Sequence, residues 1–228
     1  MNSEAKIRVW DPFVRVFHWS LVSFFFIAYV SGESESLVHI YSGYVVIALV
    51  SSRLIWGVIG TKYARFRQFA YPPAKLLEYL KQFAGGRPQH YTGHNPAAAW
   101  MIFALLLCVL LTSFTGLKLY GVMGYGPLAA TPGGVPAVVS DFSLIPDAAA
   151  KDLDRKAYRD FYRRRGDRHE NRLHEIWEEV HEFFANLTVL LVIIHVAGAV
   201  VASMVHGENL IKAMFTGVKT AHPDSEAE

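Results

Sequence analysis

Two histidines in the most hydrophobic part of the chain have the types and spacing that can do chemistry. Residues 183–205 contain no Asp, Glu, Lys or Arg, and about 20 apolar residues suffice to cross a bilayer. His181 lies two residues before this run and His195 lies inside it, 14 positions after His181. On a helix that spacing returns both rings to nearly the same face, about 21 Å apart along the axis. Because a histidine within a membrane span is costly and usually functional, the pattern predicts two stacked cofactors.

Composition agrees with a membrane protein and limits the metal chemistry. Of 228 residues, 52% are hydrophobic and 14% aromatic, and the mean hydropathy is +0.22, which is typical of a small polytopic membrane protein. A net charge of +2 and the lack of a basic arm argue against a nucleic-acid partner. With Cys108 as the single cysteine, an intrachain disulfide, a four-cysteine iron–sulfur site and covalent c-type haem are excluded. Histidines are therefore the expected ligands of any bound metal.

The hydropathy pattern predicts one membrane domain over residues 1–228 with four spans. Asp11-Pro12 and Asn95-Pro96 are typical helix starts, with an N-cap residue followed by proline. The N-terminal apolar run is followed by Gly-Glu-Ser-Glu, which is not a signal-peptidase site. An outer loop is expected over residues 120–177. The spans are predicted at about residues 13–30, 36–59, 96–119 and 182–205.

Charge in the short loops predicts the orientation. Residues 61–94 carry six basic side chains against one acid, Glu78, whereas the turn at 31–38 is acidic. The positive-inside rule therefore places both termini and the 61–94 connection in the cytoplasm. Within that connection, Tyr71-Pro72-Pro73 begins a short amphipathic segment that is expected to lie on the membrane surface.

This topology sorts four histidines into two levels. His18 and His195 fall toward the cytoplasmic side, and His39 and His181 fall toward the outer side. Each pair can hold one haem between two imidazoles, which leaves the iron six-coordinate and suits electron transfer better than oxygen binding. His206, at the membrane edge, is the alternative to His195 as the inner ligand.

Arg53 and four glycines extend the pattern. Arg53 follows His39 by 14 positions, so it shares that face but lies at the cytoplasmic level. There it either binds the propionates of the inner haem or snorkels to the membrane surface. Four small residues can let macrocycles or neighbouring helices approach closely. They are Gly43, Gly57, Gly116 and Gly198.

Several segments resemble one known family. They are WDPFVRVFHW at 10–19, VHIYSGYVVIALVSSRLIWGVIG at 38–60, TGLKLYG at 115–121 and HEFFANLTVLLVIIHVAGAVVAS at 181–203. The chain resembles the bacterial four-helix di-haem cytochrome b family, which includes bacterial cytochrome b561 and the b-type cytochrome subunits of nickel–iron hydrogenases. The resemblance implies an all-α, integral-membrane four-helix bundle with two non-covalent haem b groups stacked across the bilayer. Their ligands would match His18, His39, His181 and His195.

The resemblance also implies electron transfer across the bacterial cytoplasmic (inner) membrane, as in a respiratory electron transport chain. Electrons would pass between ubiquinone or menaquinone and a periplasmic or membrane-bound redox partner, such as a cytochrome c or a dehydrogenase subunit. The long loop at 120–177 departs from compact members and leaves the partner open. One alternative is a superoxide oxidase that passes electrons to quinone, with arginines 163–165 and 168 steering the anion. Another is a colourless, non-haem channel for protons or metals.

Overall fold

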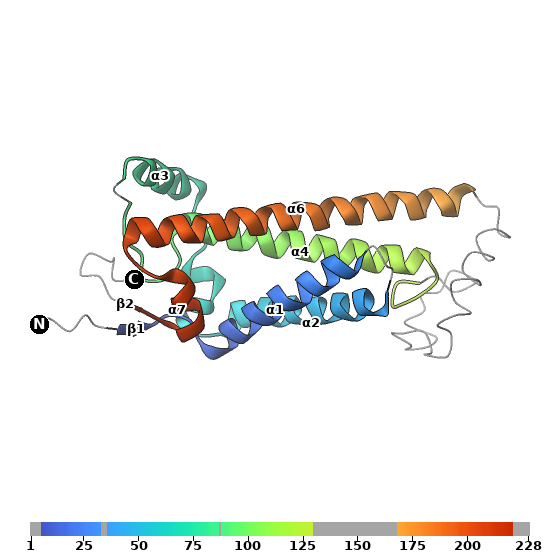
Figure 1. Ribbon diagram of the computed structural model, residues 1–228, viewed down its shortest axis with the longest axis horizontal. Coiled ribbons are helices and arrows are strands. Elements are labelled where there is room, and N and C mark those ends of the chain that lie inside the picture. The colour runs from blue at the N-terminus through green and yellow to red at the C-terminus, as the bar shows by residue number, and fades with distance from the viewer. Residues whose placement is uncertain (1–5, 33–35, 87, 130–167, 221–228) are drawn as a thin grey trace, which may run out of the picture. The chain divides into compact units, whose positions relative to one another are not determined.

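Four long helices dominate the computed structural model, which describes residues 6–32, 36–86, 88–129 and 168–220 (Figure 1). Each has a stretch long and apolar enough to cross a membrane. This confirms the predicted all-α membrane fold with four spanning helices. The helices are α1 (Pro12–Ser31), α2 (Leu37–Ile59), α4 (Pro96–Val122) and α6 (Arg168–His206).

Polar side chains cap the N-termini of three of these helices, close to the starts predicted from the sequence. The Asp11 carboxylate accepts a hydrogen bond from the Val14 amide at 2.9 Å, with proline at the first helical position. Ser36 caps α2, and the Asn95 side chain accepts from the Ala98 amide at 2.8 Å. Each cap satisfies a helix-end N–H group that has no partner within the helix.

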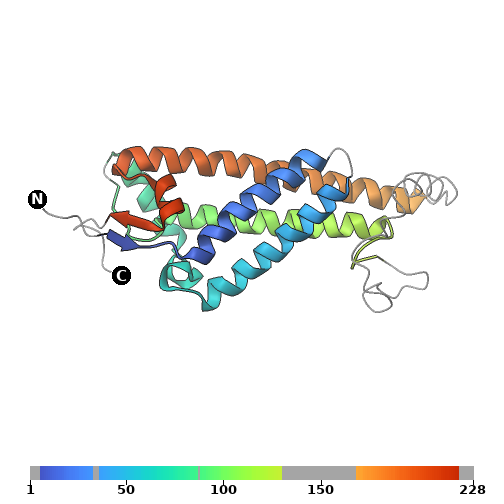
Figure 2. The same cartoon turned by 60° about the horizontal axis from the view of Figure 1, so that its bottom comes forward.

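The chain forms two compact units, and the first comprises residues 1–109 and 187–228. In it, α1 packs against α2, and the chain between α2 and α4 forms three short elements. A small antiparallel sheet pairs the two ends of the described chain, with Ile7 opposite Lys219 (Figure 2). The three elements between α2 and α4 are η2 (Lys62–Ala64), η3 (Phe66–Gln68) and α3 (Pro73–Ala84). The sheet consists of β1 (Lys6–Arg8) and β2 (Val218–Thr220), and a short helix, α7 (Leu210–Thr216), precedes β2.

The sheet joins the start of α1 to the C-terminal segment. The amides of Val9 and Trp10 donate to the Gly217 carbonyl at 2.9 and 3.2 Å. Arg15 on α1 donates to the Phe215 carbonyl at 2.6 Å. Gly217 has φ +80°, a left-handed conformation that ends α7 and favours glycine. These bonds tie residues that lie about 200 positions apart.

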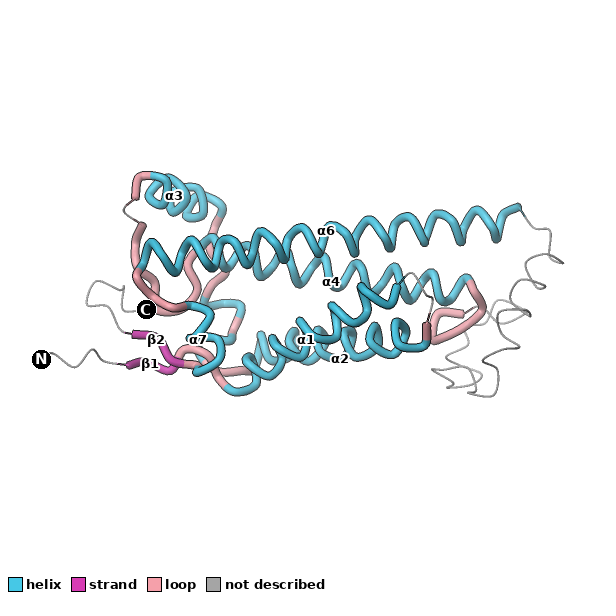
Figure 3. The backbone as a smooth tube through the Cα atoms, in the orientation of Figure 1, coloured by secondary structure: helices cyan, strands magenta, loops and turns pink. Residues whose placement is uncertain are grey.

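The second unit, Leu110–Asn186, contains the C-terminal part of α4 and the N-terminal part of α6. Here α6 begins at Arg168, within the region that the sequence analysis assigns to the outer loop. Its first turns carry acids and bases in alternation, a pattern that stabilises a solvent-exposed helix. The fourth helix is therefore longer than its membrane span. Figure 3 shows this helical continuity along α6.

The spans expose large apolar side chains, as expected where lipid is the solvent. On α1, α2 and α6 these include Phe26, Val58, Ile193 and Met204, which are between 60% and 72% exposed. The buried positions instead include small or polar residues such as Ser42, Thr115 and Thr188. The organisation of the whole chain as one domain stays a prediction.

Candidate functional site

Two of the predicted histidines approach one another in the first unit. His18 lies on α1 and His195 on α6, and they are close enough for their charges to interact. The Nδ1 atom of His18 is buried and has no hydrogen-bond partner among the described residues. Its ring packs edge-on against Trp19, with centroids 5.1 Å apart. A buried imidazole nitrogen normally has a hydrogen-bond partner, and the described residues supply none to this atom.

His39 is fixed in one tautomer by the neighbouring helix. Its Nδ1 lies 2.8 Å from the Ala28 carbonyl oxygen of α1. Because a carbonyl only accepts hydrogen bonds, Nδ1 must donate, and the lone pair of the neutral ring is on Nε2. Histidines that ligate metals usually have the second nitrogen bonded in this way.

His181 in the second unit has the same arrangement. Its Nδ1 lies 3.0 Å from the Thr112 carbonyl oxygen and 3.2 Å from the Thr115 hydroxyl. That hydroxyl itself donates to the Leu111 carbonyl at 2.8 Å or to the Thr112 carbonyl at 2.9 Å. Gly116 makes room for the ring, because a Cβ there would come within 2.9 Å of His181 Cε1. The pairing of His39 with His181 stays a prediction.

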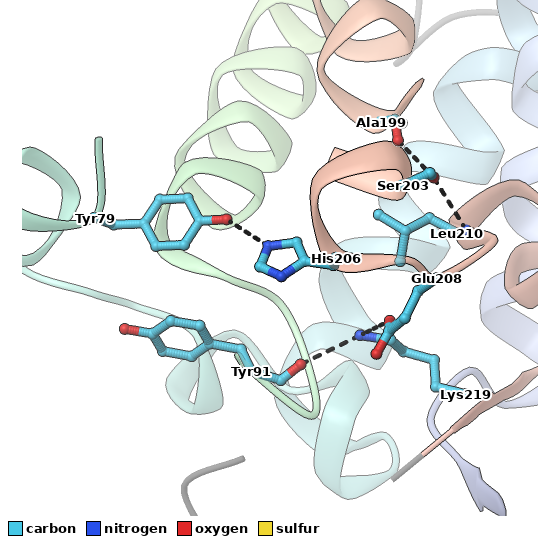
Figure 4. Close-up of polar contacts among 8 residues, drawn as sticks. All are labelled: Tyr79, Tyr91, Ala199, Ser203, His206, Glu208, Leu210 and Lys219. Carbon is cyan, nitrogen blue, oxygen red and sulfur yellow. Dashed lines mark hydrogen bonds and ion pairs between the residues drawn. The ribbon is translucent and has the colours of Figure 1, made fainter. Parts of the chain in front are cut away.

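His206, the alternative inner ligand, lies in different surroundings. Its Nε2 is 3.3 Å from the Tyr79 hydroxyl of α3 (Figure 4). Its ring also contacts that of His90, with centroids 4.6 Å apart. His206 thus contacts the segment between α2 and α4. This environment favours His195 as the candidate ligand.

Arg53 is buried, with 4% of its surface exposed, so it does not snorkel to the membrane surface. Its Nη2 donates to the Ala64 carbonyl at 3.1 Å, and its guanidinium lies 4.8 Å above the Phe66 ring. Its Nη1 is buried with no hydrogen-bond partner among the described residues. The Asp11 carboxylate is near enough for its charge to stabilise the guanidinium, but Nη1 still lacks an acceptor, and a buried donor without one is costly. The carboxylate of a cofactor fits this requirement.

The four glycines separate into two groups. A Cβ on Gly57 would clash with the Phe66 ring, and Gly116 accommodates His181, so these two serve protein packing. Gly43 and Gly198 have nothing within 4 Å of such a Cβ. They follow His39 by four positions and His195 by three, which puts each on the face of its candidate ligand. At both positions the space beside the helix is free of protein atoms.

Within the described ranges, no three His, Cys, Asp or Glu side chains are grouped so as to hold a metal ion. A mononuclear protein site for zinc or non-haem iron needs at least that number of ligands. Haem iron takes four nitrogens from its macrocycle and only one or two axial ligands from the protein. Single and paired histidines therefore suit haem better than a bare metal.

Sequence reasoning missed the role of Asp11 beyond its helix cap. Its carboxylate also accepts from the Thr61 hydroxyl at 2.6 Å and from the Trp56 indole at 3.1 Å. Burial raises the pKa of this carboxyl, but the bonds from Thr61, Val14 and Trp56 outweigh it, and the pKa lies below its ordinary value of 3.8. The Asp-Pro pair was the only signal, and it does not reveal partners 45 to 50 positions away.

The arginines behind the superoxide alternative cannot be placed in this site. Residues 163–165 lie outside the described part of the chain, as does the side chain of Arg168.

Comparison with known proteins agrees with the geometry. The family model described as prokaryotic cytochrome b561 matches residues 9–217, which include all four candidate ligands. No curated protein and no solved structure matches the chain. The match covers most of the 228 residues and all four spanning helices. The chain therefore belongs to the prokaryotic cytochrome b561 family, the multi-pass inner-membrane b-type cytochromes that bind haem b and transfer electrons.

Proposed function

We propose that this protein carries electrons across the membrane through two haem b groups, one ligated by His18 and His195 and the other by His39 and His181. The observation that carries the proposal is the bond from Nδ1 to a helix carbonyl at His39 and at His181. It orients each ring and puts its lone pair on Nε2, the usual arrangement of an axial ligand. The approach of His18 to His195 supports the first pair. The second pair rests on the common level predicted from the sequence.

The side chains bind and orient, and the haem iron supplies the one-electron chemistry. His18 with His195, and His39 with His181, would each hold a haem between two imidazoles, an arrangement that suits electron transfer better than the binding of small ligands. Arg53 is proposed to bind a haem carboxylate through Nη1, since a guanidinium matches a carboxylate in charge and geometry. Its Nη2 bond to Ala64 and its packing on Phe66 hold the guanidinium in place.

We propose a quinone as one electron partner and a periplasmic or membrane-bound redox protein as the other. The proposed haems at two levels would connect a lipid-soluble carrier with a partner at the opposite surface. Oxidation of a quinol releases two electrons and two protons; the haems would supply one-electron acceptors, and the protons would pass to solvent.

Haem content and single substitutions test the ligands. A pyridine haemochrome assay of the purified protein should give two b haems per chain. His195→Ala should remove one of them and leave the spectrum of the other intact. The matched control is His206→Ala on the same helix, which should keep both. No haem in the wild-type protein would refute the function. Loss of a haem from His206→Ala with retention in His195→Ala would refute the ligand assignment.

Rapid-mixing kinetics separate the two candidate functions. Ubiquinol or menaquinol should reduce the haems quickly if the protein is an electron carrier between quinone and a partner. Fast reduction by superoxide alone would instead identify a superoxide oxidase.

A further inference from the structure

Helix α3 has two apolar faces, and only one of them packs against the protein. Tyr79 is 3% exposed and faces inward. Leu77 and Leu80, on the other side of the helix, are 59% and 45% exposed. With Pro73 and Ala84 they follow the spacing i, i+4, i+7 and i+11, which makes a continuous stripe along a helix. A 12-residue helix with this stripe needs an apolar environment on its outer side.

The structure places α3 beside the end of α6, with Tyr79 between the two helices and the stripe on the other side. The Tyr79 hydroxyl bonds to His206 in the last turn of α6, as Figure 4 shows. Burial and the neighbouring Tyr91 raise the pKa of Tyr79 to about 12, so it stays protonated and can donate to His206. In the last two turns of α6, Val201, Met204 and Val205 are 40% to 69% exposed. Helix α3 is therefore attached at the end of a membrane-spanning helix whose last turns expose apolar side chains, and the stripe faces away from that attachment.

A second set of contacts fixes the chain around this junction. Lys219 pairs with Glu208 at 3.0 Å and donates to the Tyr91 carbonyl at 3.2 Å (Figure 4). The Leu210 amide donates to the Ser203 hydroxyl at 3.2 Å. Because these bonds join the segment after α3 to the end of α6, the position of α3 does not depend on Tyr79 alone.

The polar side of the segment is basic. On α3, Lys81 borders the exposed stripe, and Lys75 lies on the opposite face with Glu78. Just before the helix, Lys62, Arg65 and Arg67 are also exposed. A basic amphipathic helix at the end of a membrane span has the charge that anionic lipid headgroups attract.

We propose that α3 is an interfacial helix that binds anionic phospholipid. Leu77 and Leu80 enter the apolar edge of the bilayer, and Lys81, with the basic residues of η2 and η3, contacts headgroup phosphates. The bond between Tyr79 and His206 holds the helix at the depth where the α6 span ends. The inference depends on the membrane embedding of the chain and is independent of the haem ligands.

Spin labels measure the depth of α3 in the full-length, haem-loaded protein. In a Cys108→Ala background, single cysteines at positions 77 and 80 are compared with matched controls at 75 and 78 in nanodiscs. Labels at 77 and 80 should collide preferentially with oxygen, which concentrates in lipid. Labels at 75 and 78 should collide preferentially with a water-soluble nickel chelate. Equal preference at all four positions would overturn the proposal.

The preference of the protein for anionic over neutral lipid tests the proposed role of the basic side chains. Nanodiscs containing phosphatidylcholine and phosphatidylglycerol provide both headgroups, and native mass spectrometry measures which lipid the protein retains. Lys81→Gln should lower the preference for phosphatidylglycerol about five-fold, the effect of one basic residue near an anionic surface. Lys81→Arg keeps the charge and should retain the preference. A wild-type protein with no preference would overturn the proposal, even if positions 77 and 80 lie in lipid.

Discussion

His94 shows how one buried residue can make the stability of the fold depend on pH. Its ring packs against Trp10 and Phe69, with centroids 4.5 and 4.3 Å away. Burial lowers the pKa of His94 from 6.5 to about 3, and the charges of Arg53 and Lys219 lower it further in the same direction. The folded protein therefore holds this ring neutral at physiological pH.

The sign of the effect follows from linkage between proton binding and folding. Between pH 6.5 and about 3 the unfolded chain protonates His94 and the folded protein does not. The free energy of unfolding is therefore highest above pH 6.5. It decreases as the pH is lowered below 6.5, by up to about 1.4 kcal/mol per pH unit. His94→Phe keeps a ring and removes this dependence. The measurement is the change in melting temperature between pH 7 and pH 5 in detergent, for wild type and variant. An equal change in both proteins would contradict the prediction.

The candidate ligands were predictable from residue type and spacing, but their hydrogen bonds were not. His181 and His195 stand out because few polar residues interrupt their span. The carbonyl that fixes His181 belongs to Thr112, 69 positions earlier, and no local pattern reveals such a partner. The same holds for the burial of Arg53, which depends on η2 and η3 covering it.

At the scale of elements, the segment η2–η3 covers the C-terminal end of α2. Phe66 of η3 packs over the Arg53 guanidinium and also contacts Phe69 and Phe103. This close approach requires Gly57, because a Cβ at that position would overlap the Phe66 ring. The glycine on α2 therefore determines how near the covering segment can lie.

Gly57→Ala should destabilise the protein by about 1–3 kcal/mol, the usual cost of adding a methyl group to a packed site. Phe66 must move, which also removes its contact with Arg53. Gly85→Ala is the matched control, since its nearest neighbours to a new Cβ lie at 3.5 Å. Thermal unfolding of both variants in the same detergent is the measurement. Equal melting temperatures for Gly57→Ala and wild type would contradict the packing argument.

Elements were predictable where local signals are strong. Hydropathy and the Asp-Pro and Asn-Pro pairs predicted the starts of α1 and α4 at the observed positions. The strands β1 and β2 were not predicted. Each has three residues, and Lys6 pairs with Thr220 across almost the whole chain, so no local periodicity marks them.

For the whole molecule, three distant segments meet at one end of the first unit. The sheet joins the N-terminal and C-terminal segments (Figure 2). Asp11 accepts from Thr61, and Lys219 donates to Tyr91, so the connection between α2 and α4 lies at the same end. An even number of spans requires the N-terminal and C-terminal segments to lie on the same side of the membrane. The contacts thus support four crossings, and the loop charges supply the proposed direction.

Reporter fusions test the number of crossings and the direction separately. Green fluorescent protein fused to either terminus should fluoresce, because both termini are predicted to be cytoplasmic, where this reporter folds. Alkaline phosphatase, which is active only in the periplasm, should be active when fused after Gly32 at the end of α1 and inactive when fused at the C-terminus. Termini on opposite sides would contradict the pairing of β1 with β2. Both termini in the periplasm would preserve that pairing and four crossings, and would show that the basic residues of the 61–94 connection do not determine the orientation.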